Sequence, residues 1–181
     1  DLSLEIDNEL GEEEYEIAVK NNIEIKGGSP SAIKIARSTL LQLSENDKGR
    51  IAFPIINLKD SPDAGYRGLL IDLARKWHKT ETIYKLIDLA SFYKLNYLQF
   101  HLTDDQLFTF PSENFPKLQT IDKHYTKEEL LSFVDYAYQR GVVIVPEIDV
   151  PGHSMQFVKN IPKYFQYLMQ KVEVKTFLVA E

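Results

Sequence analysis

GLLIDLA, residues 68–74, is almost continuously apolar, with Asp72 as its one charged residue. Two later stretches, LNYLQFHL (residues 95–102) and VVIVPEID (residues 142–149), have a similar character. Apolar runs of this length are typical of parallel strands that are buried on both faces. The three stretches therefore predict three neighbouring strands of a parallel sheet.

The two segments between these strands have helical spacing. In residues 80–94, apolar side chains recur on one face: Ile83, Leu86, Ile87, Ala90 and Tyr93. The second segment opens with the capping box Thr126-x-x-Glu129 and closes at Gly141. Because a strand–helix–strand connection between parallel strands is right-handed, residues 66–149 predict a βαβαβ unit.

The first part of the chain has a different pattern. Apolar and polar residues alternate in three short stretches with the period of half-buried strands: Leu2, Leu4 and Ile6, then Tyr15, Ile17 and Val19, then Ile23 and Ile25. Ser29 is a suitable N-cap and Pro30 a suitable first helical residue, so a helix is predicted to follow. These elements indicate a small α/β domain.

Loop signals mark the end of this part. SENDKGR, residues 44–50, predicts a solvated loop, and residues 51–58 predict a further extended segment. KDSPDAG, residues 59–65, combines Pro and Gly and predicts a domain boundary. We therefore expect one domain at residues 1–62 and a second at residues 63–181.

Composition and charge exclude several classes of function. Apolar residues make up 44% of the 181 residues, and the net charge is −6. Eight acids and no Lys or Arg fall in residues 1–16, and no basic patch indicates nucleic acid or an anionic membrane as a partner. The absence of Cys excludes disulfides, thiolate metal sites and a Cys nucleophile. No apolar run approaches the ~18 residues of a membrane span, and the acidic start is unlike a signal peptide.

Charged residues collect where the three predicted strands end: Asp72 and Arg75, then Asp104 and Asp105, then Glu147, Asp149 and His153. In parallel α/β folds this edge carries the active site, because the loops converge there. The pattern therefore predicts a polar pocket at the carboxyl ends of the strands.

Several of these residues also have structural interpretations. Asp72 could form an ion pair with Arg75, and Asp105 could cap the following turn. His101 lies within its strand, so its partner could be structural, and Glu147 is either buried with a partner or directed into a barrel interior.

The residues alone leave two enzyme classes open. One is a barrel hydrolase that uses carboxylates and a His for acid–base chemistry. The other is a metal-dependent barrel enzyme with Asp and His ligands. The metal interpretation is the weaker one, because no two of the four histidines have ligand spacing.

Three motifs resemble those of the family-20 β-N-acetylhexosaminidases. GYRGLLIDLARKW (residues 65–77) is similar to the first barrel strand of that family, with its Arg-Gly-x-x-x-Asp-x-x-Arg pattern. KLNYLQFHLTDDQLFTFPSENFPKL (residues 94–118) is similar to the second strand and its loop. VVIVPEIDVPGHS (residues 142–154) is similar to the third strand and its Pro-Gly-His turn. Order and spacing agree, and the likeness extends over residues 2–162.

The resemblance implies a fold and an activity. The fold is a small N-terminal α/β domain followed by the first three βα units of an incomplete (β/α)8 TIM barrel. The activity is removal of terminal N-acetylhexosamine from glycans that end in N-acetylglucosamine or N-acetylgalactosamine, with no cofactor and no metal. In this family the acetamido oxygen of the sugar attacks the anomeric carbon, so the scheme of two enzyme carboxylates does not apply. The family likeness also implies a periplasmic, secreted or lysosomal location.

Four residues match family positions that have roles. Arg67 matches the arginine that holds the C3 and C4 hydroxyls of the terminal sugar, to which a guanidinium fork is well suited. Asp104 and His153 match an Asp–His pair that orients and tunes the catalytic acid. Asp149 matches a carboxylate near the same pocket with a supporting role.

The sequence also departs from the family pattern. The family's general acid belongs to an adjacent Asp-Glu pair after the fourth strand, and these 181 residues contain no Asp followed by Glu. A complete barrel takes about 250 residues. Gln99 replaces a His of many members, and Leu107-Phe108 replaces a Gly-Trp pair. We expect an inactive N-terminal fragment of such an enzyme.

Two further expectations follow from the missing strands and from the tail. Open sheet edges and exposed apolar faces predict self-association into a dimer or a larger homo-oligomer. Residues 164–181 have no clear family counterpart. They could form a helix over residues 162–171 and a strand over residues 172–179, or they could be an altered end from a truncated reading frame. The rival interpretations are a non-catalytic carbohydrate-binding module and a self-assembling domain with a vestigial site.

Overall fold

The structure is a computed structural model that describes residues 1–165. It divides into two compact units, and this division does not follow the predicted domain boundary at residues 62–63. One unit contains Asp1–Leu70, Lys79–Gln99 and Leu131–Val145, and the other contains Ile71–His78, Phe100–Leu130 and the chain from Pro146. The predicted boundary stays a prediction.

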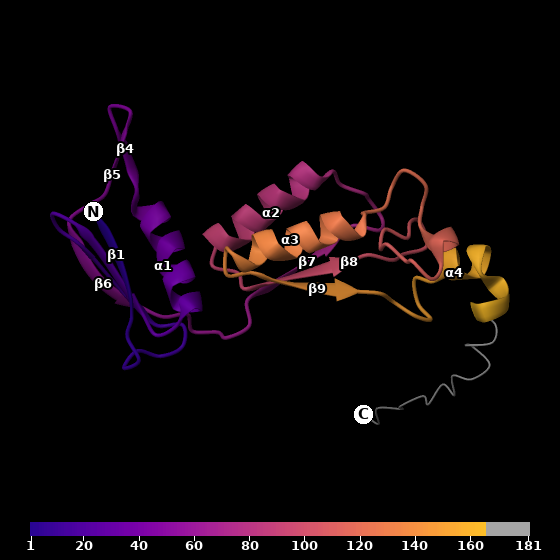
Figure 1. The fold of residues 1–181 in the computed structure, drawn as a ribbon, viewed down its shortest axis with the longest axis horizontal. Helices are drawn as coiled ribbons and strands as arrows, with labels where there is room; N and C mark the ends of the chain where they lie inside the picture. The colour runs from indigo at the N-terminus through magenta and orange to yellow at the C-terminus, as the bar shows by residue number, and fades with distance from the viewer. Residues whose placement is uncertain (166–181) are drawn as a thin grey trace, which may run out of the picture. The chain divides into compact units, whose positions relative to one another are not determined.

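The first sheet has four strands in the order β1-β3-β2-β6 (Figure 1). Their bounds are Leu2–Ile6 for β1, Tyr15–Val19 for β2, Ile23–Gly27 for β3 and Ile56–Asp60 for β6. β1 pairs with β3 in parallel, whereas β2 is antiparallel to both β3 and β6. The three alternating stretches of the sequence therefore form the predicted strands.

Helix α1, Pro30–Leu43, covers this sheet and completes its core. The Oγ of Ser29 accepts hydrogen bonds from the backbone N–H groups of Ser31 and Ala32, which confirms the predicted N-cap. The buried core joins both elements: Tyr15, Ile17, Val19 and Ile25 from the strands, with Ala32, Ile35, Ala36 and Leu40 from the helix.

The predicted solvated loop at residues 44–50 is wrong in part, because residues 45–52 form a short hairpin. β4 (Glu45–Asp47) pairs with β5 (Arg50–Ala52) through the two-residue turn Lys48-Gly49. Both turn residues have positive φ, 52° and 84°, as a primed hairpin turn requires. Lys is not a typical residue for that position, so the sequence does not show the turn.

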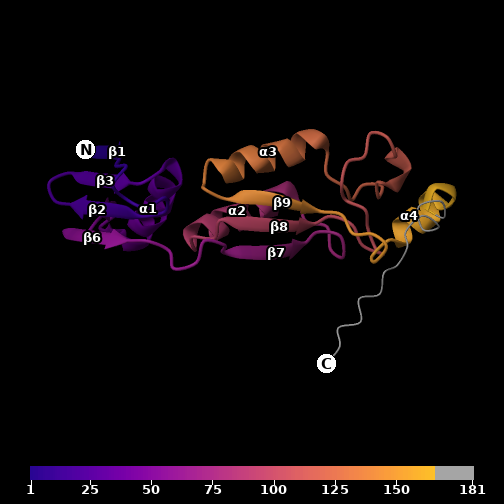
Figure 2. The same cartoon turned by 90° about the horizontal axis from the view of Figure 1, so that it is seen from below.

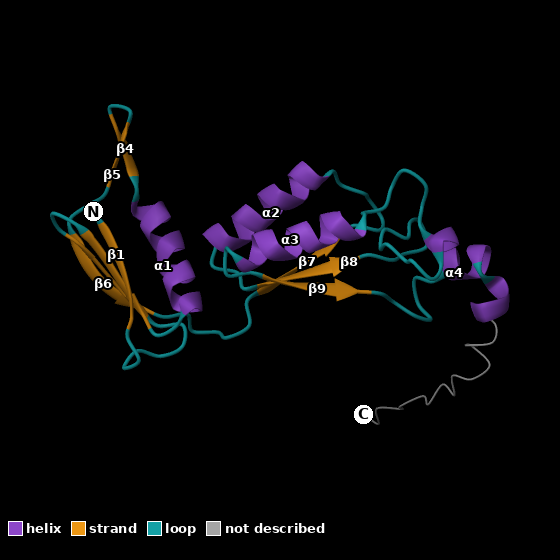
Figure 3. Ribbon diagram, viewed as in Figure 1, coloured by secondary structure: helices purple, strands orange, loops and turns teal. Residues whose placement is uncertain are grey.

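The second sheet contains β7 (Gly68–Asp72), β8 (Tyr97–His101) and β9 (Val143–Glu147), with β8 in the middle. The three arrows point the same way, and helices α2 (Thr80–Phe92) and α3 (Lys127–Tyr138) lie on one side of the sheet (Figures 1 and 2). Figure 3 shows the strand–helix alternation of this part directly. The predicted βαβαβ unit and the α/β fold class are confirmed.

The ends of α3 follow the sequence signals closely. The N–H of Glu129 donates to Oγ1 of Thr126, and the N–H of Thr126 donates to a carboxylate oxygen of Glu129, so the capping box forms in both directions. At the other end Gly141 has a φ of 77°, and the N–H of Val142 donates to the carbonyl of Ala137. This left-handed Gly ends the helix and starts β9.

The remaining described elements are the short helix η1 (Pro116–Leu118) and α4 (Met155–Asn160). Within residues 1–165, no helix is long and apolar enough to cross a membrane. The predicted helix over residues 162–171 is helical at residues 162–165. The rest of that helix and the predicted strand over residues 172–179 lie outside the described residues.

Candidate active site

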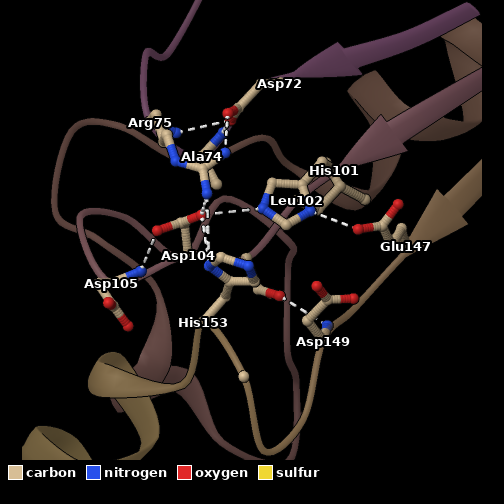
Figure 4. Close-up of polar contacts among 12 residues, drawn as sticks. Asp72, Ala74, Arg75, His101, Leu102, Asp104, Asp105, Glu147, Asp149 and His153 are labelled. Carbon is tan, nitrogen blue, oxygen red and sulfur yellow. Dashed lines mark hydrogen bonds and ion pairs between the residues drawn. The ribbon is translucent and has the colours of Figure 1, made fainter.

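The carboxyl ends of all three barrel strands supply charged side chains to one cluster. Asp72 ends β7, His101 ends β8 and Glu147 ends β9. The following loops add the other members: Arg75, Asp104 and His153. Figure 4 shows these side chains directed toward one another, with His101 between Asp104 and Glu147. The cluster therefore forms at the edge where the sequence predicts a pocket.

Asp104 is the centre of the cluster, and only 2% of it is exposed. Its Oδ2 lies 2.8 Å from Nη2 of Arg75, 3.0 Å from Nε2 of His101 and 3.1 Å from Nδ1 of His153. Its Oδ1 accepts a hydrogen bond of 2.6 Å from the N–H of Asp105. Burial alone would raise the pKa of Asp104, but the hydrogen bonds from His101 and Asp105 and the charge of Arg75 lower it below its usual range.

His101 bridges two carboxylates and is itself buried, with 4% of the residue exposed. Its Nε2 contacts Asp104, and its Nδ1 lies 2.5 Å from Oε1 of Glu147. Because both ring nitrogens face carboxylate oxygens, both need a proton to donate. Burial would lower the pKa of His101, but the hydrogen bonds to Asp104 and Glu147 outweigh burial and raise the pKa. The geometry and the charge balance both favour the imidazolium form.

Asp72 fixes the backbone after β7 and the guanidinium of Arg75. Its Oδ1 accepts the N–H groups of Ala74 and Arg75, and its Oδ2 lies 2.6 Å from Nη1 of Arg75. The predicted ion pair of Asp72 and Arg75 is therefore present. It also directs Nη2 of Arg75 to Asp104, while half of the Arg75 side chain stays exposed to solvent.

His153 enters the cluster from the turn after β9. Its backbone φ is 53°, in the left-handed region that few non-glycine residues occupy. The Oγ of Ser154 hydrogen-bonds within this turn, to the carbonyls of Asp149 and Gly152. The ring of His153 lies edge-on to that of His101 at 5.5 Å between centroids, and 42% of its side chain is exposed. His153 therefore joins the buried Asp104 to the open side of the cluster.

Comparisons with known proteins show which family the chain belongs to. Residues 65–179 match the model of "Glycosyl hydrolase family 20, catalytic domain". The chain belongs to glycosyl hydrolase family 20. A β-hexosaminidase of Vibrio furnissii is 33% identical over 91% of this chain and 30% of its own length. The chain thus spans about a third of the curated relatives it matches.

Solved family-20 structures support the fold over the same region. The exo-β-N-acetylglucosaminidase of Vibrio harveyi, solved in complex with N-acetylglucosamine, has a TM-score of 0.82 at 33% identity, over 90% of this chain and 29% of that one. The β-N-acetylhexosaminidase of Bacteroides fragilis has a TM-score of 0.83 at 29% identity, over 90% and 36%. The predicted family is therefore confirmed, as is the fold of an N-terminal unit with part of a TIM barrel.

Within this family-20 chain, Asp149 and Asp105 lie beside the cluster. The N–H of Asp149 donates to Oγ1 of Thr103 at 3.0 Å. The Oδ1 of Asp105 accepts the N–H of Met155 at 3.1 Å, and its capping of the following turn stays a prediction. Asp105 thus ties the loop after β8 to the start of α4.

Arg67 lies just before β7, at the opposite end of that strand from Asp72. Its Nη1 and Nη2 lie 2.8 and 2.9 Å from the two carboxylate oxygens of Glu13, and its Nε donates to the carbonyl of Lys94. Only 15% of its side chain is exposed. The fork predicted to hold sugar hydroxyls thus holds Glu13, and its role in sugar binding stays a prediction.

Two sets of side chains in the described residues have metal-donor atoms within 4.8 Å of one another: His101, Asp104 and His153, and His101, Glu147 and Asp149. In both sets, His101 already faces a carboxylate through each ring nitrogen. In the first set, the guanidinium of Arg75 also occupies the shared oxygen of Asp104. The cluster therefore has the contacts of an ion-pair network.

The sequence named Arg75, His101 and Glu147 at the strand ends without giving them roles. Only their position in the sequence indicated that they belong to the site, because each lies within three residues of the end of its strand. Two of their contacts join distant parts of the chain: His101 and Glu147 are 46 positions apart, and Arg75 and Asp104 are 29 positions apart. No local pattern encodes such contacts, so only the folded sheet shows them.

Proposed function

We propose that this chain forms the first part of the active site of a β-N-acetylhexosaminidase that removes terminal N-acetylglucosamine or N-acetylgalactosamine. The observation that carries the proposal is the contact of His153 with the buried Asp104 at the carboxyl ends of the strands. The names of several relatives, β-hexosaminidases and N-acetylglucosaminidases, support the substrate class. The mechanism is the substrate-assisted, retaining one, in which the sugar's acetamido oxygen attacks.

In this mechanism Asp104 and His153 serve a general acid. The carboxylate of Asp104 holds Nδ1 of His153, so the ring presents its other nitrogen, Nε2, to a neighbouring carboxyl. An imidazole oriented in this way fixes and tunes an acid, as the third group does in a catalytic triad. Asp149 supplies a further negative charge near the same edge in a supporting role.

Arg75 is better placed than Arg67 to bind the sugar. Its guanidinium is half exposed and lies in the cluster, held by Asp72 and Asp104. A fork fixed on one side by carboxylates presents its remaining donors in a defined plane, which suits two neighbouring hydroxyls. The Arg67 fork is mostly buried against Glu13. We therefore assign the ring hydroxyls to Arg75 and a structural role to Arg67.

The general acid itself has to come from outside these 181 residues, which contain no Asp-Glu pair. The isolated chain is therefore proposed to have no hydrolytic activity. The parent polypeptide, meaning the natural protein in which residues 1–181 occur, is proposed to be the active form. Its location is proposed to be periplasmic, secreted or lysosomal, as the family likeness implies.

The test compares two nitrophenyl glycosides that differ only at C2. The purified parent polypeptide should hydrolyse 4-nitrophenyl N-acetyl-β-glucosaminide and leave 4-nitrophenyl β-glucoside almost untouched, since the glucoside lacks the attacking acetamido group. The isolated chain should hydrolyse neither. Equal turnover of both glycosides, or no turnover of either by the parent polypeptide, contradicts the proposal.

A second candidate function is carbohydrate binding without catalysis. The half-exposed Arg75 and His153 favour it, because they could bind a sugar without a general acid. Calorimetric titration of the isolated chain with N-acetylglucosamine separates the two functions. Saturable binding that disappears in Arg75→Ala supports the binding module, whereas the absence of binding supports an incomplete enzyme site.

A further inference from the structure

His101 and its partner Glu147 have no role in the family likeness, which gives roles to Asp104 and His153. His101 is almost completely buried, and each of its ring nitrogens meets a different carboxylate. One is Asp104 on the loop after β8, and the other is Glu147 at the end of β9. A buried ring with two such partners cannot rotate without losing both hydrogen bonds.

We propose that His101 and Glu147 form a positioning pair, which fixes the Asp104 carboxylate in the orientation in which it contacts His153. The inference rests on the proposed function, since it concerns how the Asp104–His153 pair is held. Neither His101 nor Glu147 touches the reacting atoms in this proposal. They act through Asp104.

The geometry gives each member of the pair a distinct task. Oδ2 of Asp104 is shared by Arg75, His101 and His153, and only His101 is as buried as the carboxylate itself. The side chains of Arg75 and His153 are 50% and 42% exposed, so bound substrate or water competes for them. His101 is therefore the partner that keeps Oδ2 in place when the other two engage a substrate.

Glu147 keeps a proton on each ring nitrogen of His101, so that the ring can donate hydrogen bonds to Glu147 and Asp104 together. A carboxylate at Nδ1 stabilises the doubly protonated ring, and only that form donates from Nδ1 and Nε2 together. With a neutral amide at this position, the ring carries one proton. That proton goes either to Asp104 or to the amide oxygen, and the Asp104 contact weakens. The link from Glu147 to Asp104 thus passes through the charge state of one imidazole.

Other charged groups also face this ring. Asp72 at the end of β7 adds negative potential, and Arg75 and His153 share Asp104 with His101. A carboxylate oxygen of Asp149 lies within 4.8 Å of a ring nitrogen of His101. The carboxylates favour the cationic ring and Arg75 opposes it. A test has to change Glu147 alone and leave these groups in place.

The substitution Glu147→Gln keeps size and shape and removes the charge. Histidine-selective ¹⁵N spectra of the parent polypeptide should show a doubly protonated His101 at pH 7.5 in the wild type and a singly protonated ring in Glu147→Gln. In the same proteins, kcat for the nitrophenyl N-acetylglucosaminide should fall about 10–100-fold, a part of the 10²–10⁴-fold that general acid–base catalysis contributes. KM should change less than twofold, and the alkaline limb of the pH profile should move to lower pH.

Two further variants keep the result interpretable. Glu113→Gln, an exposed carboxylate paired with Lys127, is the matched control and should leave all readouts unchanged. His101→Gln, which retains one donor for Asp104, should recover part of the activity that His101→Phe loses. An unchanged kcat in a folded Glu147→Gln protein, or a singly protonated His101 in the wild type, overturns the inference.

The failure of the proposed function looks different. A parent polypeptide without turnover defeats the hexosaminidase proposal and the positioning role together. The ¹⁵N spectra still report whether Glu147 controls the ring of His101, so an error in the contact is distinguished from an error in the activity.

Discussion

Oδ2 of Asp104 lies 3.1 Å from Nδ1 of His153, although 49 positions separate the two residues in the chain. Asp104 follows β8 and His153 follows β9, so the contact exists only because the two strands run side by side in the same direction. The pair is open to solvent on the His153 side and closed on the Asp104 side. His153 can therefore contact groups in a substrate site while its orientation and proton affinity are set by the buried carboxylate of Asp104.

The cluster makes stability depend on pH in a defined direction. The raised pKa of His101 means that its stabilising contribution is complete below its ordinary value of 6.5 and is lost as pH rises through the folded-state pKa. His101→Gln should therefore be less stable than the wild type by about 1–3 kcal/mol at pH 5.5. The difference should shrink toward pH 9, as urea unfolding at a series of pH values would show. A difference that grows with pH contradicts the imidazolium assignment.

The contribution of Asp104 to stability has the opposite pH dependence. Its pKa is lowered, so its contribution is complete above its ordinary value of 3.8 and is lost as pH falls through the folded-state pKa. Asp104→Asn should cost about 1–3 kcal/mol at pH 6 and progressively less below pH 3.8. Acid unfolding curves of the two proteins should therefore converge. A constant difference down to pH 2 would show that the carboxylate charge is not the stabilising feature.

The Arg67–Glu13 pair should behave as a structural contact. Because the pair is bidentate and mostly buried, a double-mutant cycle with Arg67→Ala and Glu13→Ala should give a coupling energy of about 1–3 kcal/mol. Arg67→Lys should recover little of it, since an ammonium cannot form the two parallel bonds. Chemical unfolding measures all four corners. A coupling near zero would leave Arg67 available for a ligand.

Gly28 should be intolerant of any side chain. An added Cβ would lie 1.9 Å from the carbonyl oxygen of Gly11 and 2.6 Å from that of Leu10. Backbone has to move to accept it, so Gly28→Ala should destabilise the protein by about 1–3 kcal/mol. Gly65→Ala is the matched control, because nothing lies within 4 Å of its added Cβ. Equal thermal stability of the two variants would contradict the packing at Gly28.

The isolated chain should self-associate. β7 and β9 are the edge strands of the second sheet, and they expose apolar side chains: Leu69, Leu70, Val143 and Val145. Such an open edge favours pairing with a second copy. Sedimentation at micromolar concentration should show a dimer or larger species, reduced by Leu70→Glu more than by Ile51→Glu on the β5 hairpin. A monomeric wild type refutes this prediction.

Much of the fold could be predicted because its signals are local. The Ser29 cap, the Thr126–Glu129 capping box and the left-handed Gly141 each act within a few residues, and each forms as the sequence indicates. The hairpin at residues 45–52 could not be predicted, because Lys48 adopts a positive φ that its side chain does not favour.

The site was predicted less completely, because its contacts are not local. Strand ends could be located, and Asp104 with His153 followed from the family likeness. Which arginine faces the cluster depends on the partner each one finds: Glu13, distant in sequence, for Arg67 and the neighbouring Asp72 for Arg75. Tertiary packing therefore determines which of the two arginine side chains lies in the cluster.

Whether Asp104 serves catalysis through His153 can be decided by one kinetic comparison. Asp104→Asn keeps the shape of the side chain and removes its charge, and Asp122→Asn is the control at an exposed, left-handed residue where Asn is equally suitable. In the parent polypeptide, Asp104→Asn should lower kcat for 4-nitrophenyl N-acetyl-β-glucosaminide by about 100-fold with little change in KM, within the range of general acid–base effects. Asp122→Asn should leave kcat unchanged. A folded Asp104→Asn protein that retains the wild-type kcat would show that Asp104 has no role in catalysis.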